Sequence, residues 1–184
     1  MRITGGSLCG RKVEVPDGII RPAMDRMRES VFAILGDLSA KSFLDIFSGS
    51  GIIALEAASR GADPVEAVEM DPIKRQTLLK NVSIAPVRIH CHFMSAELFV
   101  KRAKGPFDYI FCDPPFPYRF KQNLVASISK SKLISTDSML LIHRPREDQF
   151  PETLEQLQLV DRREYGRSIV DFYQPLANVK KSIF

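Results

Sequence analysis

The chain has 184 residues, of which 45% are hydrophobic and 26% charged, and its formal net charge is +4. This composition is typical of one folded domain with a substantial core, and no run is long and apolar enough to span a membrane. The three cysteines have no metal-like spacing and are odd in number, which favours a reducing cytoplasm and excludes a disulfide framework.

The N-terminal residues are predicted to form an arm outside the main domain. Two strand-like segments, 2–4 and 11–15, are separated by glycines, a pattern that predicts a β-hairpin within residues 1–20. An amphipathic helix is expected from residue 21 to the stop at Gly36. We therefore divide the chain into a hairpin arm (1–20), a main domain (21–175) and a C-terminal tail (176–184).

The stretch from Phe43 to Gly51 is predicted to be a buried strand followed by a glycine turn. The strand is apolar except for Asp45, and Gly49 and Gly51 follow at a spacing of two, just before a helical run at 52–58. Strand, glycine turn and helix make up the first unit of a nucleotide-binding α/β sheet, where glycine lets the backbone approach a ligand. A plain tight turn is the alternative interpretation of this signal.

Two further strands are expected at 65–68 and 87–93. The first ends at Glu69, roughly 20 residues past the first strand, where such folds place an acidic residue on a ribose. Asp71-Pro72 has the pattern of a helix N-cap and first turn. His90 and His92 share one face of the next strand, and we interpret them as strand surface because no further metal ligands are evident.

A fourth predicted strand, 107–112, leads into Asp113-Pro114-Pro115-Phe116. Two prolines give a stiff, extended loop with few backbone donors. Asp113 and the Pro114 carbonyl can accept hydrogen bonds from an exocyclic amine while Phe116 stacks on its ring, so the stretch predicts a pocket for a flat, amine-bearing base. A fifth strand ends at His143, interpreted as structural because the sequence shows no partner for it, and a hairpin over 159–174 closes the chain.

These motifs resemble those of class I S-adenosylmethionine-dependent methyltransferases that act on exocyclic amines, through Asp45-x-Phe47-x-Gly49-x-Gly51, Glu69 and Asp113-Pro114-Pro115-Phe116. More narrowly, the chain resembles the RsmD family of 16S ribosomal RNA guanine-N2 methyltransferases, through Gly5-Gly6, Gly10-Arg11-Lys12, Arg21-Pro22-x-x-Asp25-Arg26-x-Arg28-Glu29 and Leu55-Glu56-Ala57-x-Ser59-Arg60-Gly61-Ala62. The likeness runs from residue 2 to about residue 175. It departs from the family pattern at Ile20, Ala23 and Ser95, the last where an Asp or Asn often receives the adenine amine.

The resemblance implies a Rossmann-like α/β fold with a seven-stranded, mostly parallel sheet, helices on both faces and the N-terminal hairpin arm. It implies S-adenosylmethionine as cofactor and methylation of the exocyclic N2 of a guanine in 16S rRNA. We expect a monomer whose RNA substrate is either naked RNA or part of an assembling small subunit. The implied catalytic residues are Asp113, Pro114, Pro115 and Phe116. The implied cofactor residues are Asp45, Phe47, Ser48, Gly49, Gly51, Glu69, Met70, Ser95, Ala96 and Asp113.

Basic residues gather at the start of the chain, at 101–104 and at 119–132, which suits a polyanionic partner, although a solvated surface has the same composition. The expected RNA contacts are Arg2, Arg11, Lys12, Arg21, Arg26, Arg119 and Lys121. Three alternatives remain on the sequence: an adenine-N6 methyltransferase of DNA or other RNA, a non-catalytic RNA-binding relic of the fold, and an NAD oxidoreductase. The last would favour a third glycine where the chain has Ala54.

Overall fold

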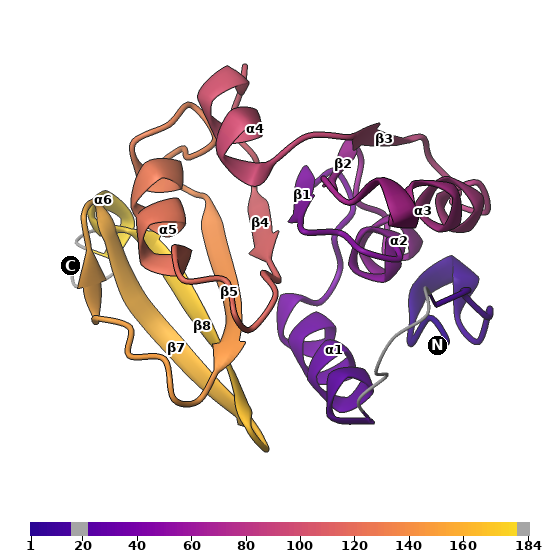
Figure 1. Ribbon diagram of the computed structural model, residues 1–184, viewed down its shortest axis with the longest axis horizontal. Coiled ribbons are helices and arrows are strands. Elements are labelled where there is room, and N and C mark those ends of the chain that lie inside the picture. Colours follow the sequence, from indigo (N-terminus) through magenta and orange to yellow (C-terminus); the bar gives the residue numbers. More distant parts are fainter. Residues whose placement is uncertain (16–21, 180–184) are drawn as a thin grey trace.

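One continuous sheet runs through the protein, and helices cover both of its faces (Figure 1). The computed structural model describes residues 1–15 and 22–179. The strands are β1 (Phe43–Ile46), β2 (Val65–Val68), β3 (Ile89–His92), β4 (Tyr109–Cys112), β5 (Met139–Pro145), β6 (Thr153–Leu154), β7 (Leu157–Tyr165) and β8 (Ser168–Pro175). The helices are α1 (Pro22–Leu35), α2 (Ile52–Ser59), α3 (Arg75–Val82), α4 (Ala96–Arg102), α5 (Lys121–Ser129) and α6 (Leu176–Val179).

The strand order is β3-β2-β1-β4-β5-β8-β7-β6. The first five strands pair in parallel, and β8 joins β5 in the antiparallel sense. The predicted α/β architecture is therefore confirmed, but the described sheet has eight strands rather than seven. The additional strand is the two-residue β6, which pairs with β7 at the sheet edge and is too short to show an alternating pattern in the sequence.

The core lies in two layers, one on each side of the sheet. Successive strand residues alternate between them: Phe43 and Phe111 pack with α1 and α2, whereas Leu44 and Ile110 pack with α4 and α5. Because buried parallel strands contact helices on both faces, their sequences are continuously apolar. This explains why the apolar runs at 43–47 and 107–112 identified strands so clearly.

In the described part of the predicted arm, residues 1–15, the hairpin is a single antiparallel bridge, between Arg2 and Lys12, around a short 3-10 helix at Gly6–Leu8. The rest of the arm lies outside the described residues. Ile3 and Val13 are nonetheless buried in the same core layer as α1 and α2. The segment is therefore packed onto the body of the protein. Residues 176–179 of the predicted tail form α6, and the Leu176 amide donates to the Gln156 carbonyl; residues 180–184 lie outside the described residues.

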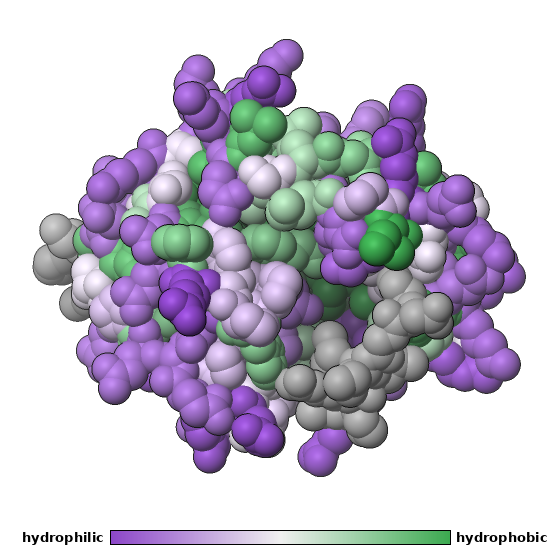
Figure 2. All heavy atoms as spheres, in the orientation of Figure 1, coloured by the Kyte–Doolittle hydropathy of each residue, from purple (hydrophilic) through white to green (hydrophobic). Residues whose placement is uncertain are grey.

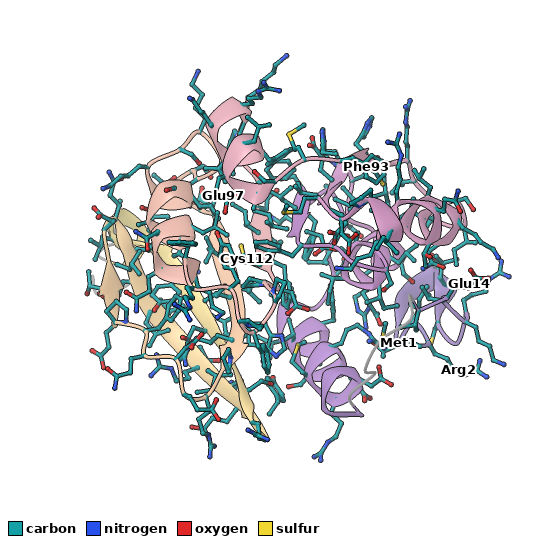
Figure 3. The ribbon with its side chains drawn as sticks, in the orientation of Figure 1. Met1, Arg2, Glu14, Phe93, Glu97 and Cys112 are labelled. Atoms are coloured by element: carbon teal, nitrogen blue, oxygen red, sulfur yellow. The ribbon has the colours of Figure 1, made fainter. Side chains whose placement is uncertain are left out.

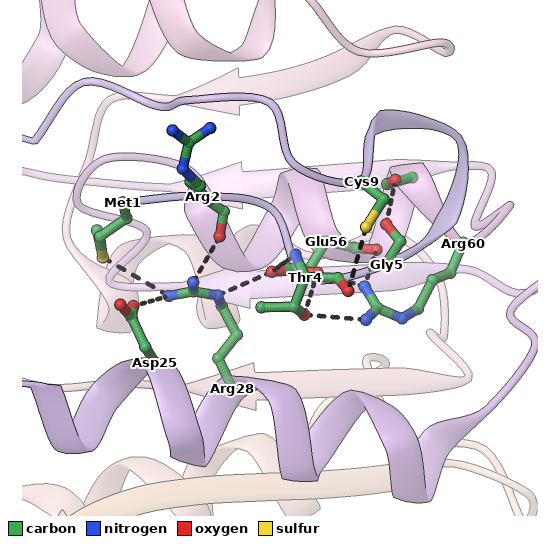
Figure 4. Close-up of polar contacts among 10 residues, drawn as sticks. Met1, Arg2, Thr4, Gly5, Cys9, Asp25, Arg28, Glu56 and Arg60 are labelled. Atoms are coloured by element: carbon green, nitrogen blue, oxygen red, sulfur yellow. Dashed lines mark hydrogen bonds and ion pairs between the residues drawn. The ribbon is translucent and has the colours of Figure 1, made fainter.

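A buried ionic cluster holds the N-terminal segment against α1 and α2 (Figure 4). Glu56 of α2, which is fully buried, accepts hydrogen bonds from the Thr4 amide at 2.8 Å, from Arg28 Nε at 2.8 Å and from Arg60. Arg28 also donates to the Arg2 carbonyl at 2.7 Å. A buried carboxylate is stable only when it is paired and hydrogen-bonded, so these contacts fix residues 2–4 to the helices.

No helix in the described part of the chain is long and apolar enough to cross a membrane.

Candidate active site

The direction of chain crossover reverses at β1, which lies between β2 and β4. In open α/β sheets, ligands bind outside the carboxyl ends of the strands at this point. Ile46 and Cys112 are paired across the two strands, and the Asp113 amide donates to the Ile46 carbonyl at 3.1 Å. The structure therefore brings together the glycine turn after β1 and the Asp-Pro-Pro-Phe loop after β4. Cys112, the last residue of β4, lies near the centre of the molecule in Figure 3.

The turn after β1 has three left-handed residues, Phe47 (φ 66°), Gly49 (φ 57°) and Gly51 (φ 81°). A Cβ added to Gly49 would meet only the Phe47 carbonyl oxygen, at 3.9 Å. A Cβ added to Gly51 would meet Leu78 Cδ1 at 2.7 Å and Val82 Cγ1 at 3.0 Å, both on α3. Gly51 is therefore required for the close packing of α3, and Gly49 is the glycine whose missing side chain leaves the backbone approachable.

Asp45 is fully buried beneath this turn. Its Oδ2 accepts hydrogen bonds from Ser48 Oγ at 2.5 Å and from the Ala54 amide at 3.2 Å, whereas Oδ1 has no hydrogen-bond partner among the described residues. The pKa of Asp45 is raised to about 7, chiefly because the side chain is buried; the Ser48 hydrogen bond opposes this rise and the nearby carboxylate of Asp113 adds to it. The predicted cofactor residues Asp45 and Ser48 thus form one buried unit.

Glu69, at the end of β2, is 4% exposed. One carboxylate oxygen accepts from the Gly49 amide and the other from the Asp71 amide, each at 2.8 Å. Glu69 therefore fixes the glycine turn to the end of the neighbouring strand. Each carboxylate oxygen has two lone pairs, so the predicted contact with ribose hydroxyls is compatible with these bonds and stays a prediction.

The remaining predicted cofactor residues lie after β2 and β3. Met70 is 61% exposed, unusually so for a large apolar side chain, and Ile73 nearby is more exposed still. Ser95 is the N-cap of α4, where its Oγ accepts from the Leu98 amide at 3.3 Å, and the Ala96 side chain is buried. The Ser95 hydroxyl therefore has a structural role at the start of α4.

Asp113 has a partner that sequence reasoning missed. His143 of β5 is almost fully buried, and its Nδ1 lies 2.7 Å from Asp113 Oδ1. An ionised carboxylate can only accept, so Nδ1 carries the hydrogen. His143 Nε2 is buried and has no partner among the described residues. The ring of Phe116 meets the imidazole edge-on, with 5.7 Å between ring centroids.

Lys121 clamps the Asp-Pro-Pro-Phe loop from inside. Its Nζ donates to the carbonyls of Phe116 and Tyr118, each at 2.7 Å, and lies 2.8 Å from Asp148 Oδ2. Because Lys121 is 4% exposed, the expectation that it contacts RNA is wrong. Tyr118, which sequence reasoning also missed, packs on Phe47 with 5.4 Å between ring centroids and so joins the two loops.

The other expected RNA-binding cations that the structure describes are exposed: Arg2, Arg11, Lys12, Arg26 and Arg119. Arg21 lies outside the described residues. Arg119 follows the Asp-Pro-Pro-Phe loop, whereas Arg2 lies at the outer edge of the molecule, well away from Cys112 (Figure 3). An RNA that contacted both Arg119 and Arg2 would therefore have to extend across the protein. No group of side chains in the described part of the chain could hold a metal ion.

Residues 1–174 match the family described as conserved hypothetical protein 95. Ribosomal RNA small subunit methyltransferase D of Escherichia coli K12 is 30% identical over 154 residues, which cover 82% of this chain and 78% of that protein. The chain belongs to this RsmD family. YlbH of Bacillus subtilis strain 168 is 29% identical over 95% of the chain and 98% of its own length. A solved structure of yhhF from Escherichia coli has a TM-score of 0.86 at 30% identity, covering 96% of this chain and 98% of that one.

Membership of the RsmD family makes the protein a methyltransferase with S-adenosylmethionine as cofactor. The residues at the carboxyl edge suit that molecule. The buried, unpaired oxygen of Asp45 and the carboxylate of Glu69 suit a cofactor with a cationic sulfonium and a ribose. The approachable backbone of Gly49 and the exposed Met70 suit its methionine and adenine parts respectively.

Proposed function

We propose that the protein methylates the exocyclic N2 of a guanine in 16S ribosomal RNA. The observation that carries the proposal is the position of Asp113, which lies beside the glycine turn and is fixed by His143. Support for the RNA comes from the name of the Escherichia coli relative, a ribosomal RNA small subunit methyltransferase. Support for an exocyclic amine comes from the acceptors that the Asp-Pro-Pro-Phe loop presents.

The target amine has two hydrogens, and the loop offers two acceptors for them. Asp113 Oδ1 is already bonded to His143, which leaves Oδ2 for one N–H, and the Pro114 carbonyl is the acceptor for the other. Phe116 stacks on the base, a contact worth about 1–3 kcal/mol. These groups fix the plane of the guanine and the direction of its N2 lone pair.

S-adenosylmethionine, when bound, supplies an electrophilic methyl group on a cationic sulfur. Guanine N2 is a weak nucleophile because its lone pair is delocalised into the ring, so orientation is the main contribution of the protein. Positioning of this kind is worth roughly 7–11 kcal/mol in the best intramolecular reactions. As the N2–CH3 bond forms and the carbon–sulfur bond breaks, positive charge develops on N2 beside the Asp113 carboxylate.

The proton is lost after the methyl group is transferred. The cationic N-methylated amine is strongly acidic, so Asp113 Oδ2 can accept its proton without being a strong base. The side chain of Asp113 is 20% exposed, which allows the proton to pass on to water. The protein then needs no separate general base at this site.

The proposed RNA contacts are those expected cations that are exposed, namely Arg2, Arg11, Lys12, Arg26 and Arg119. Each removed phosphate contact is expected to flatten the salt dependence of RNA binding by about one unit of slope. We further propose that the protein acts as a monomer on an assembling small subunit, where a ribosomal guanine is presented in a folded context.

The test is a single-turnover reaction with methyl-labelled S-adenosylmethionine and small-subunit particles that lack the modification, followed by nucleoside analysis. N2-methylguanosine is the expected product, and Asp113→Ala should reduce its formation by orders of magnitude while cofactor affinity and melting temperature stay near the parent values. N6-methyladenosine as product would refute the assignment of guanine. Cofactor binding without transfer to any RNA would refute the catalytic proposal.

A further inference from the structure

Two groups of cations that are distant in sequence meet in one groove between α4 and α5. Its walls are formed by the C-terminal parts of these helices and the turns that follow, and its volume is about 650 Å³. Five cations line it: Lys101, Arg102, Lys104, Lys130 and Lys132. All five are exposed, and Figure 2 shows hydrophilic side chains that project from the surface at the outer end of α4.

The positive charge of the groove is largely uncompensated. Of the five groove cations, only Lys130 has an ion-pair partner among the described residues, namely Glu155 at 2.9 Å. The groove contains one acid, Glu97, which accepts a hydrogen bond from Tyr118. Cations in the last turn of a helix are favoured by its dipole, which accounts for Lys101 and Arg102. It does not account for the cations in the turns beyond the helices.

The groove is continuous with the catalytic loop. Glu97 lies in the first turn of α4 and holds Tyr118, whose amide donates to the Pro115 carbonyl at 2.8 Å. Helix α4 is seven residues long, or roughly 10 Å at about 1.5 Å per residue. The groove is therefore long enough to contact more than one phosphate of a single strand, beginning beside the loop that holds the target base.

We propose that this groove binds the phosphate backbone of the RNA on one side of the target nucleotide. The inference rests on the proposed function, because that function supplies the RNA. Contacts of this kind position a substrate and carry no base specificity. The groove would therefore govern affinity for the RNA and its salt dependence, and leave both the methyl-transfer step and the choice of base unchanged.

The test compares two pairs of substitutions that remove the same charge. The groove pair is Lys104→Ala with Lys132→Ala, and the control pair is Arg163→Ala with Arg167→Ala on the hairpin of β7 and β8. The groove pair should flatten the plot of log K against log salt for 16S rRNA by about two units. It should raise the KM for RNA with kcat unchanged, whereas the control pair should behave as the parent.

Equal salt slopes for the groove pair and the parent would overturn the proposal. So would a loss of binding confined to assembled particles, because it would assign the groove to an acidic protein. The groove pair must keep the melting temperature of the parent. If it does not, Lys101→Ala with Lys132→Ala is measured instead. The parent protein is assayed for methyl transfer in parallel. If the parent transfers methyl groups but the groove pair leaves the salt slope unchanged, only the groove proposal is refuted. If the parent transfers none, the proposed function is refuted, and the salt slopes of RNA binding still test the groove.

Discussion

The hydrogen bond between His143 and Asp113 leads us to predict that His143 affects the rate of methyl transfer. His143→Leu removes the donor to Asp113 Oδ1, which lies 2.7 Å from Nδ1. A hydrogen bond to a charged group contributes about 1.5–3 kcal/mol. If all of that energy serves to orient Asp113 in the transition state, methyl transfer should slow by about 10- to 150-fold. His143→Asn places an amide donor near the position of Nδ1 and should recover most of the rate.

The measurement is the single-turnover rate with labelled cofactor, with calorimetric S-adenosylmethionine binding and the melting temperature recorded for each variant. Both variants should bind the cofactor normally, because His143 is on β5 and, among the residues that the structure describes, makes no hydrogen bond or ring contact with the glycine turn. The leucine variant should show a lower kcat with little change in KM.

Two results would refute this reasoning. Transfer by His143→Leu at the parent rate would show that Asp113 needs no orientation. Equal losses in the leucine and asparagine variants, together with equal falls in melting temperature, would show that His143 only fills space beneath Phe116, whose ring it contacts edge-on.

Three further predictions concern the turn, the N-terminal cluster and Asp45. Gly51→Ala should lower the free energy of unfolding by about 1–3 kcal/mol, because residue 51 has a left-handed φ and the added Cβ would clash with α3. Gly49→Ala should weaken cofactor binding more than it lowers stability. Urea titration measures the stability of each variant, and calorimetry measures its cofactor affinity. Glu56→Ala removes the buried carboxylate that pairs with Arg28 and Arg60 and leaves Arg28 with only the half-exposed Asp25, so it should cost about 3–5 kcal/mol in the same titration. Because the pKa of Asp45 is raised to about 7, the folded protein retains a proton that the unfolded chain loses above about pH 4. Its stability should therefore fall as pH rises from about 4 to 7, and Asp45→Asn should flatten that slope.

The fold was largely predictable because its signals are local. Each central strand is a short apolar run that ends in a turn residue or an acid, and the structure places those ends at one edge of the sheet. The weaker predictions were those that needed long-range contacts. The N-terminal hairpin became a single bridge because Ile3 and Val13 are buried against the helices of the main domain.

The partner of Asp113 was hidden for a related reason. Cys112 pairs with Ile142 in the parallel register of β4 and β5, so the next residues along, Asp113 and His143, come side by side. The sequence contains both residues but not the adjacency of the two strands. Once β4 and β5 are known to be neighbours, aligning their carboxyl ends is enough to predict the contact between Asp113 and His143. His143 then has a role beside the proposed target base and not a purely structural one.

The cations show most clearly what composition cannot resolve. Arg28, Lys121 and Arg144 are each at most 4% exposed and lie against the carboxylates of Glu56, Asp148 and Asp171. These three cations are neutralised by carboxylates inside the fold and do not attract RNA, although they count toward the net charge of +4. An RNA surface must therefore be sought among cations that are both exposed and unpaired. By that criterion Lys121 is removed from the predicted interface, and the groove between α4 and α5 enters it.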